Sequence, residues 1–254
     1  MPTRRFRRPP IFSTSLSWAN GSWKKVRPPA GCCASRKQPG RVAVFFSRTL
    51  PCMKQRRPAA APRKPTVFAP ENRFERWDAR TLLAHPDPEF EQCHFVGCDF
   101  SEAKLGALRF TDCLFERCNL SSASLAGTGL QNVAFTDCKL AGLQFAACRD
   151  FLFEVRFTGC QLHYTSFFGK KLRGTRFVNC SLTDADFTSA DLTDAAFQDC
   201  TLPGAVFRNT LLTGADFTTA SQFTIDPDGN TLTKARFSLP GLLGLVSKYG
   251  VIVE

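Results

Sequence analysis

Cysteine is the residue with the most chemistry to offer in this sequence. The chain of 254 residues has 12 cysteines, and clustered thiolates bind zinc or form disulfides. No two of them form a Cys-x-x-Cys pair, which is the spacing typical of a metal site. Six recur at one constant interval, which lengthens by two only once, in the middle of the series: Cys98, Cys118, Cys138, Cys160, Cys180 and Cys200. The regular interval predicts one repeated structural position filled by a small apolar residue, with no metal or cofactor.

The other residues with catalytic potential do not form a recognisable set. His94 and His163 flank large apolar residues of a repeat and are expected to face outward, whereas His85 precedes that repeat. Four cations come together in GKKLRGTR (169–176), but no strand-to-helix junction makes this stretch a phosphate-binding loop. We interpret it as a surface salt-bridge cluster, with a site for an anionic partner as the alternative. The sequence therefore predicts a protein that is not an enzyme.

The elements that position these residues follow from a second periodicity, of five residues. Phe or Leu stands at every fifth position from Phe90 to Phe145 and again from Leu152 to Phe217. Helices need apolar spacings of three and four and strands a spacing of two, so a step of five requires a bend in every unit. Because the cysteines return after every fourth unit, four units complete one coil. The sequence predicts a four-sided coil with Phe and Leu inside.

One irregularity interrupts both periodicities at the same place. The Phe and Leu register and the cysteine register each gain two residues within Ala146 to Phe151. We expect Arg149 and Asp150 to bulge outward while Cys148 stays inside. Lys170 then occupies an inward position about one coil later, which is unusual for a charge. We predict an ion pair between Asp150 and Lys170, the alternative being two charges that each face solvent.

The repeated pattern Ala/Cys-x-x-Phe/Leu-x, as in ADFTSADLTDAAF, resembles the pentapeptide repeat family over about residues 88–237. The resemblance implies an all-β protein, a right-handed quadrilateral parallel β-helix. We divide the chain into a basic N-terminal extension without a fold (1–69), an N-terminal cap (70–88), the β-helix (89–225) and a loop with a C-terminal helix (226–254). Phe74, Trp77, Leu82 and Leu83 are expected to plug the first coil.

The C-terminal segment SLPGLLGLVSKYGVIVE predicts a short helix and a strand-like end. Ser238 fits the helix N-cap and Gly250 the stop. The apolar residues at helical spacing are Leu239, Leu242, Leu243 and Val246. Covering the last coil is one purpose of such a helix. The resemblance to gyrase-protecting members of the family implies a second purpose, formation of a homodimer.

The N-terminal extension differs in charge from the rest of the chain. Residues 1–85 have 19 Lys and Arg against 3 acids, whereas residues 86–254 have 14 against 19. Three interpretations remain open for this extension: a targeting peptide, an arm that binds nucleic acid or another anionic surface, and a start codon assigned too early, with Met53 as the true start. The apolar runs that a secretion signal or membrane span needs are absent, so we expect a cytoplasmic location.

Acidic residues dominate the second half of the repeat. Between Phe177 and Asp228 there are eight acids and one base. Six of these acids are candidate partner-binding residues: Asp184, Asp186, Asp191, Asp194, Asp199 and Asp216. The sequence resembles the quinolone-resistance and related topoisomerase-binding members of the family, which imitate duplex DNA and bind gyrase. It lacks their long projecting loop, and its first half is balanced in charge, so a scaffold for another protein partner is the broader expectation.

Overall fold

The computed structural model describes residues 16–19, 22–25 and 72–250, and the chain divides into two units, residues 1–61 and 62–254. In the first unit, β1 (Leu16–Ala19) and β2 (Ser22–Lys25) form an antiparallel hairpin, which the composition of the extension did not predict. Most of the predicted extension, including Met53, and the strand-like end at 251–254 lie outside the described residues.

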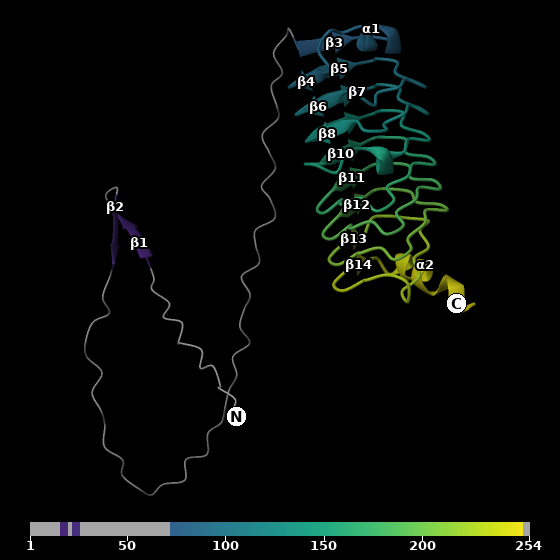
Figure 1. The fold of residues 1–254 in the computed structure, drawn as a ribbon. Helices are drawn as coiled ribbons and strands as arrows, with labels where there is room; N and C mark the ends of the chain where they lie inside the picture. Colours follow the sequence, from purple (N-terminus) through teal and green to yellow (C-terminus); the bar gives the residue numbers. More distant parts are fainter. Residues whose placement is uncertain (1–15, 20–21, 26–71, 251–254) are drawn as a thin grey trace, which may run out of the picture. The chain divides into compact units, whose positions relative to one another are not determined.

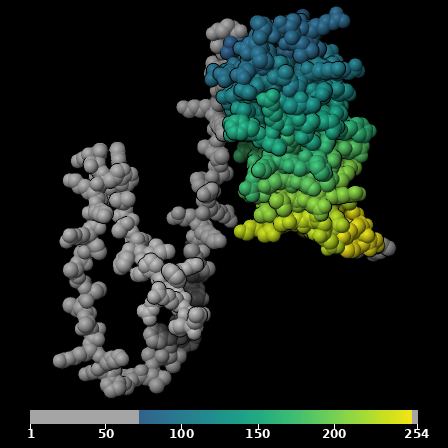
Figure 2. Space-filling view, in the orientation of Figure 1, coloured from purple at the N-terminus to yellow at the C-terminus, as the bar shows by residue number. Residues whose placement is uncertain are grey.

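The second unit is a parallel β-solenoid, as the five-residue period predicts. Its first wall is a sheet of nine strands in the order β14-β13-β12-β11-β10-β9-β7-β5-β3, stacked along the body in Figure 1. The space-filling view shows the coils following one another from the N-terminal to the C-terminal end (Figure 2). The strands are β3 (Arg73–Glu75), β5 (His94–Val96), β7 (Leu114–Glu116), β9 (Val133–Thr136), β10 (Val155–Thr158), β11 (Arg176–Val178), β12 (Ala196–Gln198), β13 (Asp216–Phe217) and β14 (Arg236–Phe237).

The other three walls follow in chain order around each coil. Single β-bridges build the second wall from Asp78 to Ser221 and the third wall through Lys104–Ser124 and from Gln144 to Val206. The fourth wall contains β4 (Glu89–Glu91), β6 (Arg109–Thr111) and β8 (Gly129–Gln131), and bridges continue it from Lys171 to Thr231.

The register between strands confirms that four units make one coil. Phe115 pairs with Phe135, and Phe157 pairs with Phe177, in each case four units later in the chain. Phe135 pairs with Phe157, which is four units and two further positions later, so the insertion lies between these two strands. The Phe and Leu side chains of the period fill the interior, and all of them are buried except Leu152. The amide of Cys118 lies 3.4 Å from the Cys138 thiol, which places both cysteines on one wall.

Leu152 contradicts the expectation that the inward register resumes there. Its side chain is 63% exposed and its φ is 55°. The two extra residues form a turn outside the coil, in which the Phe153 amide donates to the Asp150 carbonyl at 3.3 Å. Phe153 packs against the core in place of Leu152. Cys148 is buried, as predicted.

The corners of the coil require left-handed backbone. Gly204 has a φ of 71°, and a Cβ there would lie 2.2 Å from Oδ1 of Asp184 in the preceding coil. Gly214 is placed in the same way against Asp194, at 2.3 Å. At other corners Asp, Asn and Ser also adopt the left-handed region, which Asn and Asp tolerate better than most residues. The corners thus explain much of the polar composition.

The N-terminal cap agrees with the prediction in three of its four residues. Leu82 of α1 (Ala79–Leu83) is fully buried, and Phe74 and Trp77 pack against the core with ring centroids 4.3 Å apart. Leu83 is 49% exposed, so its predicted place in the plug is wrong. The helix is short, and Leu82 and Leu83 point to different sides of it because successive helical residues are rotated by about 100°.

The C-terminal cap begins where the Phe and Leu register fails. Gln222 is exposed, and Phe223 and Ile225 are buried in its place. A 3₁₀ turn (Pro240–Leu242), α2 (Leu243–Val246) and another 3₁₀ turn (Ser247–Tyr249) follow β14. The Ser238 hydroxyl accepts a hydrogen bond from the Gly241 amide at 3.1 Å, and Gly250 ends the segment with a φ of 63°. Both features match the sequence prediction.

Candidate functional site

Only outward positions of the solenoid are available to a partner, because the interior is filled. These positions are of two kinds: wall residues that flank the buried Phe or Leu, and corner residues. Asp186 lies on the third wall, Asp191 on the fourth and Asp216 on the first. The structure therefore places the predicted acidic wall residues on three different walls.

Each acidic wall residue also has a structural role. The Oδ1 atoms of Asp186, Asp191 and Asp216 accept hydrogen bonds from the amide two residues later, at 2.9, 3.1 and 3.0 Å. Such local bonds stabilise the turn into the next corner. Hydrogen bonds from Thr218 hold the pKa of the Asp216 carboxyl below its usual value against the opposing effect of burial, which is the largest single influence. The Asp216 carboxyl is therefore charged at neutral pH.

The remaining three candidates are corner residues. Asp184, Asp194 and Asp199 have φ values of 53°, 57° and 52°. They place further carboxylates at the corners between the walls. Two of the six acids are neutralised by neighbouring coils, because Arg173 contacts Asp191 at 2.8 Å and Arg236 contacts Asp216 at 3.0 Å. The six carboxylates surround the C-terminal half of the solenoid and do not form a patch on one wall.

The predicted dimerisation residues lie on the C-terminal cap and are mostly exposed. The exposed fractions of Leu239, Leu242 and Leu243 are 84%, 44% and 50%, whereas Val246 is half-buried. Lys248 fastens the cap to the preceding loop through ion pairs with Asp226 and with Asp228, the second at 2.6 Å. Sequence reasoning missed this latch, although Lys248 stands four five-residue units after Asp228, and this spacing of one full coil was an available signal.

Two of the four cations at 169–176 form ion pairs, Lys170 with Asp150 and Arg173 with Asp191, so the salt-bridge interpretation holds for these two. Lys170 Nζ lies 2.6 Å from Asp150 Oδ1 and also donates to the Cys148 carbonyl at 2.6 Å. This confirms the predicted pair. The lysine side chain is only 3% exposed, and its ammonium lies 5.1 Å from the centre of the Phe153 ring. Sequence reasoning missed the exposed Phe151 and Leu152 beside this pair.

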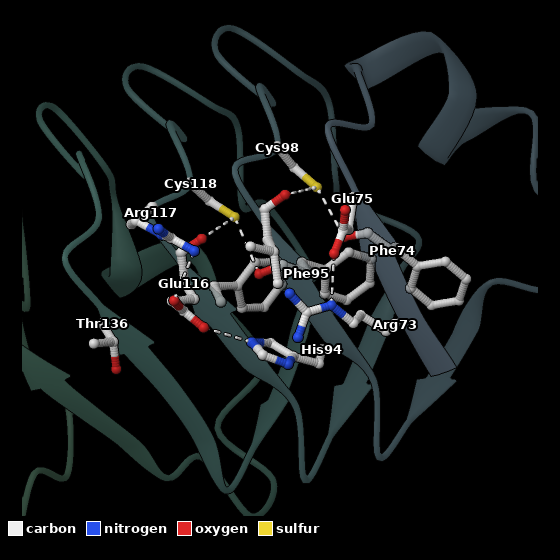
Figure 3. Close-up of polar contacts among 12 residues, drawn as sticks. Arg73, Phe74, Glu75, His94, Phe95, Cys98, Glu116, Arg117, Cys118 and Thr136 are labelled. Carbon is white, nitrogen blue, oxygen red and sulfur yellow. Dashed lines mark hydrogen bonds and ion pairs between the residues drawn. The ribbon is translucent and has the colours of Figure 1, made fainter. Parts of the chain in front are cut away.

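The cysteines are packing residues in the described part of the chain. All nine between Cys93 and Cys200 are buried, and none of these nine forms a disulfide. Eight of these thiols donate to main-chain carbonyls, as Cys98 and Cys118 do in Figure 3. Contact with neighbouring thiols and burial raise the pKa of the Cys138 thiol, and burial raises that of Cys148 to about 12. Within residues 72–250, no three potential ligands are placed to hold a metal ion.

The histidines do not form a catalytic set in this part of the chain. His94 lies on the outer side of β5, yet its side chain is only 11% exposed, because Glu116 of the next coil contacts its Nε2 at 2.9 Å (Figure 3). His94 thus faces outward, as the sequence predicts, but Glu116 covers it and keeps it from solvent. The ring of His85 lies against Phe90, with centroids 5.1 Å apart. Among the residues described, no helix is long and apolar enough to cross a membrane.

Solved structures that match the chain include full-length QnrB1, a plasmid-mediated fluoroquinolone resistance protein, at 17% identity and a TM-score of 0.40, covering 70% of this chain and 97% of that one. HetL from the cyanobacterium Nostoc, involved in heterocyst differentiation regulation, matches at 16% identity and a TM-score of 0.21, covering 65% and 88%. A pentapeptide repeat protein from the Arabidopsis thaliana thylakoid lumen matches at 20% identity and a TM-score of 0.20, covering 56% of this chain and 72% of that one.

None of the curated proteins matches the chain. The model of the pentapeptide repeat region, in contrast, matches residues 88–167 and 151–239, which together make up more than half of the chain. Because that match coincides with the coils of the solenoid, the chain belongs to the pentapeptide repeat family.

Proposed function

We propose that the chain is a non-catalytic interaction protein whose C-terminal half binds the DNA-binding groove of a partner, and that the partner is DNA gyrase or a related topoisomerase. The observation that carries this proposal is the excess of negative charge between Phe177 and Asp228. This stretch of the solenoid has eight acidic residues and only one basic residue. Stacked phenylalanine rings inside the solenoid, such as Phe187 and Phe207 with centroids 5.1 Å apart, make the backbone that bears these acids rigid.

The linear charge density supports imitation of DNA. Coils rise by about 4.8 Å, so these residues climb about 12 Å and have one net negative charge per roughly 1.8 Å. Duplex DNA has one per about 1.7 Å. Arg173 and Arg236 reduce the density, because they neutralise Asp191 and Asp216. Carboxylates on several walls suit a partner that surrounds the solenoid, as a groove for duplex DNA does.

The test uses purified gyrase in a supercoiling assay, with and without a quinolone. The full chain is compared with a variant in which Asp186, Asp191 and Asp216 are all replaced by Asn, which keeps the hydrogen bonds to the following amides. We expect wild type to bind gyrase and change supercoiling, and the variant to bind at least tenfold more weakly and with less dependence on salt. Failure of the wild-type chain to bind any type II topoisomerase would refute the choice of partner.

We further propose that the exposed leucines of the C-terminal cap form a homodimer. Leu239, Leu242 and Leu243 lie together on a segment that the Lys248 latch holds against the last coil. Sedimentation equilibrium of the full chain should give twice the mass of one copy. Leu239→Ser with Leu243→Ser should give the mass of one copy without unfolding the solenoid.

The basic extension supports a second candidate function, binding of nucleic acid or another anionic surface. Residues 1–85 have an excess of 16 positive charges. If the extension is responsible, a chain shortened to residues 69–254 loses DNA binding together with its steep salt dependence. If the solenoid is responsible, the shortened chain keeps its protein partner. The cytoplasmic location stays a prediction.

A further inference from the structure

The turn at the two-residue insertion exposes apolar side chains where the rest of the solenoid is polar. Between residues 90 and 237, five large apolar residues are exposed: Phe151, Leu152, Tyr164, Phe168 and Leu211. Phe151 and Leu152 are the tip of the turn, with exposed fractions of 74% and 63%. Phe168, exposed by 55%, lies two residues before Lys170, the lysine that holds the turn. Clustered exposed apolar groups mark interaction sites.

The backbone conformation at the tip of the turn suggests that Leu152 does not stabilise the fold. Leu152 is the third residue of the turn and has a φ of 55°, a place that favours Gly or Asn. A leucine there costs backbone energy, and no burial offsets that cost.

The turn is held rigidly from below. Asp150, its first residue, contacts the buried ammonium of Lys170 at 2.6 Å, and Phe153, its last residue, packs against the core under the same ammonium. The Phe153 amide closes the turn on the Asp150 carbonyl. The tip residues are therefore ordered before any partner arrives, which lowers the entropy cost of binding.

A pocket lies next to the tip on the fourth wall. Its volume is about 520 Å³, and Leu152, Phe153, Glu154, Lys171 and Arg173 are among its lining residues. Arg149 and Lys171 are exposed and flank the turn, Arg149 directly before it and Lys171 in the following coil. Among the described residues neither of these two cations forms an ion pair, whereas Asp150 and Arg173 are already paired.

We propose that the turn at 150–153 is a preformed knob that inserts Phe151 and Leu152 into an apolar pocket on a partner protein, whose carboxylates meet Arg149 and Lys171. This site is separate from the acidic half and rests on the proposed function only in requiring a protein partner. The solenoid thus has a second, basic contact in addition to its acidic C-terminal half. The two contacts together determine where along the solenoid the partner binds.

The first experiment uses purified gyrase as the probe, by biolayer interferometry on the full chain. Phe151→Ser with Leu152→Ser should weaken binding by at least tenfold, the loss typical of buried apolar anchors. Leu211→Ser, which removes an exposed leucine from the same wall, should change it by less than about twofold. Lys171→Glu should slow association. Unchanged binding by the double variant would overturn the proposal.

Leu152→Gly separates binding from folding. Glycine relieves the left-handed backbone, so the Tm should stay the same or rise while gyrase binding falls. A lower Tm together with unchanged binding would show that Leu152 is structural, against the proposal.

If gyrase binds no form of the chain, that result refutes only the choice of gyrase as the partner. A second experiment then tests whether the turn at 150–153 binds another protein. A photo-cross-linking phenylalanine is placed at Phe151 or, as a control on another part of the coil, at Tyr164, and cross-linked peptides from a cell lysate are sequenced. Support requires a partner peptide with apolar residues beside Asp or Glu, linked from 151 but not from 164. Equal labelling at both positions, or a peptide without carboxylates, overturns the proposal.

Discussion

Phe177 and Phe197 stack face to face, with ring centroids 4.9 Å apart and planes inclined by 1°. They occupy equivalent positions in successive coils, and each also meets Phe187 edge-on, at 6.0 and 5.9 Å. In the C-terminal half the interior is thus two columns of stacked rings that touch at right angles, with leucines on the remaining walls. Both contact geometries are favourable for aromatic pairs. The columns make each coil depend on its neighbours.

Truncation of a ring in the middle of a column should therefore be costly. Phe177→Ala should lower the free energy of unfolding by about 3–5 kcal/mol, because the cavity lies between two fixed coils and cannot collapse. Urea denaturation followed by circular dichroism measures the loss. Gln198→Ala, an exposed position on β12, should change stability by less than about 0.5 kcal/mol. A loss below about 1 kcal/mol for Phe177→Ala would contradict a tightly stacked interior.

The Asp150–Lys170 pair should make stability depend on acid pH. The hydrogen bond and charge of Lys170 hold the pKa of Asp150 below its usual value of 3.8. A lowered folded-state pKa contributes stability that is fully present above the unfolded-state value and is lost as the pH falls through the folded-state value. The difference in stability between wild type and Asp150→Asn should thus be constant from pH 7 to about pH 5, begin to shrink near about pH 4 and be lost as the pH falls through the lowered pKa of Asp150 in the folded protein.

Urea titrations of both proteins at pH 7, 5 and 3 measure this difference. Gln198→Ala is the control, because neither residue ionises and its difference from wild type should not change with pH. A difference between wild type and Asp150→Asn that is as large at pH 3 as at pH 7 would mean that the ion pair does not stabilise the turn.

The C-terminal cap should depend on the absence of a side chain at Gly244. A Cβ at this position would lie 2.2 Å from the Phe223 carbonyl oxygen, and the Ile225 amide donates to the Gly244 carbonyl at 3.0 Å. Gly244→Ala should push the helix away from the last coil and speed hydrogen exchange at the Ile225 amide by at least tenfold. Gly229→Ala is the control, since its nearest atom is 4.0 Å away. Equal exchange rates of the Ile225 amide in both variants would mean that the C-terminal helix does not pack against Phe223 through Gly244.

The thiols of the solenoid should be unreactive in the folded protein. The nine cysteines from Cys93 to Cys200 are buried, and a raised pKa keeps the thiols of Cys138 and Cys148 protonated. Ellman's reagent at pH 8 should therefore label at most Cys32, Cys33 and Cys52 quickly, and the other nine only after unfolding in urea. Rapid labelling of more than three thiols in the native protein would show that the coils open readily.

Regular features of the solenoid were predictable to the residue, and irregular ones were not. The length of a coil, its four sides and the position of the insertion all followed from two registers that change together between Cys138 and Cys160. The pair of Asp150 with Lys170 followed too, because the coil length says which residues lie above one another. Leu152 was assigned to the wrong side, since two extra residues let the chain choose which apolar side chain, Leu152 or Phe153, packs inside.

The candidate site shows the same division. The acids from Asp184 to Asp216 were identifiable as outward residues, but their separation onto three walls, and the neutralisation of Asp191 and Asp216 by arginines about one coil away, were not anticipated. Leu83 was wrongly placed, and the burial of the outward-facing His94 was not anticipated. Their exposure depends on what lies over them, and for His94 that is Glu116 of the following coil.

The sequence by itself determined the repeat, the size of the coil and the division between inward and outward residues, because a five-residue step leaves the backbone only one regular way to bury its Phe and Leu. The tertiary structure alone decided where outward charges meet, which side chain fills the insertion and how the cap is fastened. Those outcomes depend on contacts between residues one full coil apart, and whether such a contact forms is set by packing between coils and not by the spacing within one.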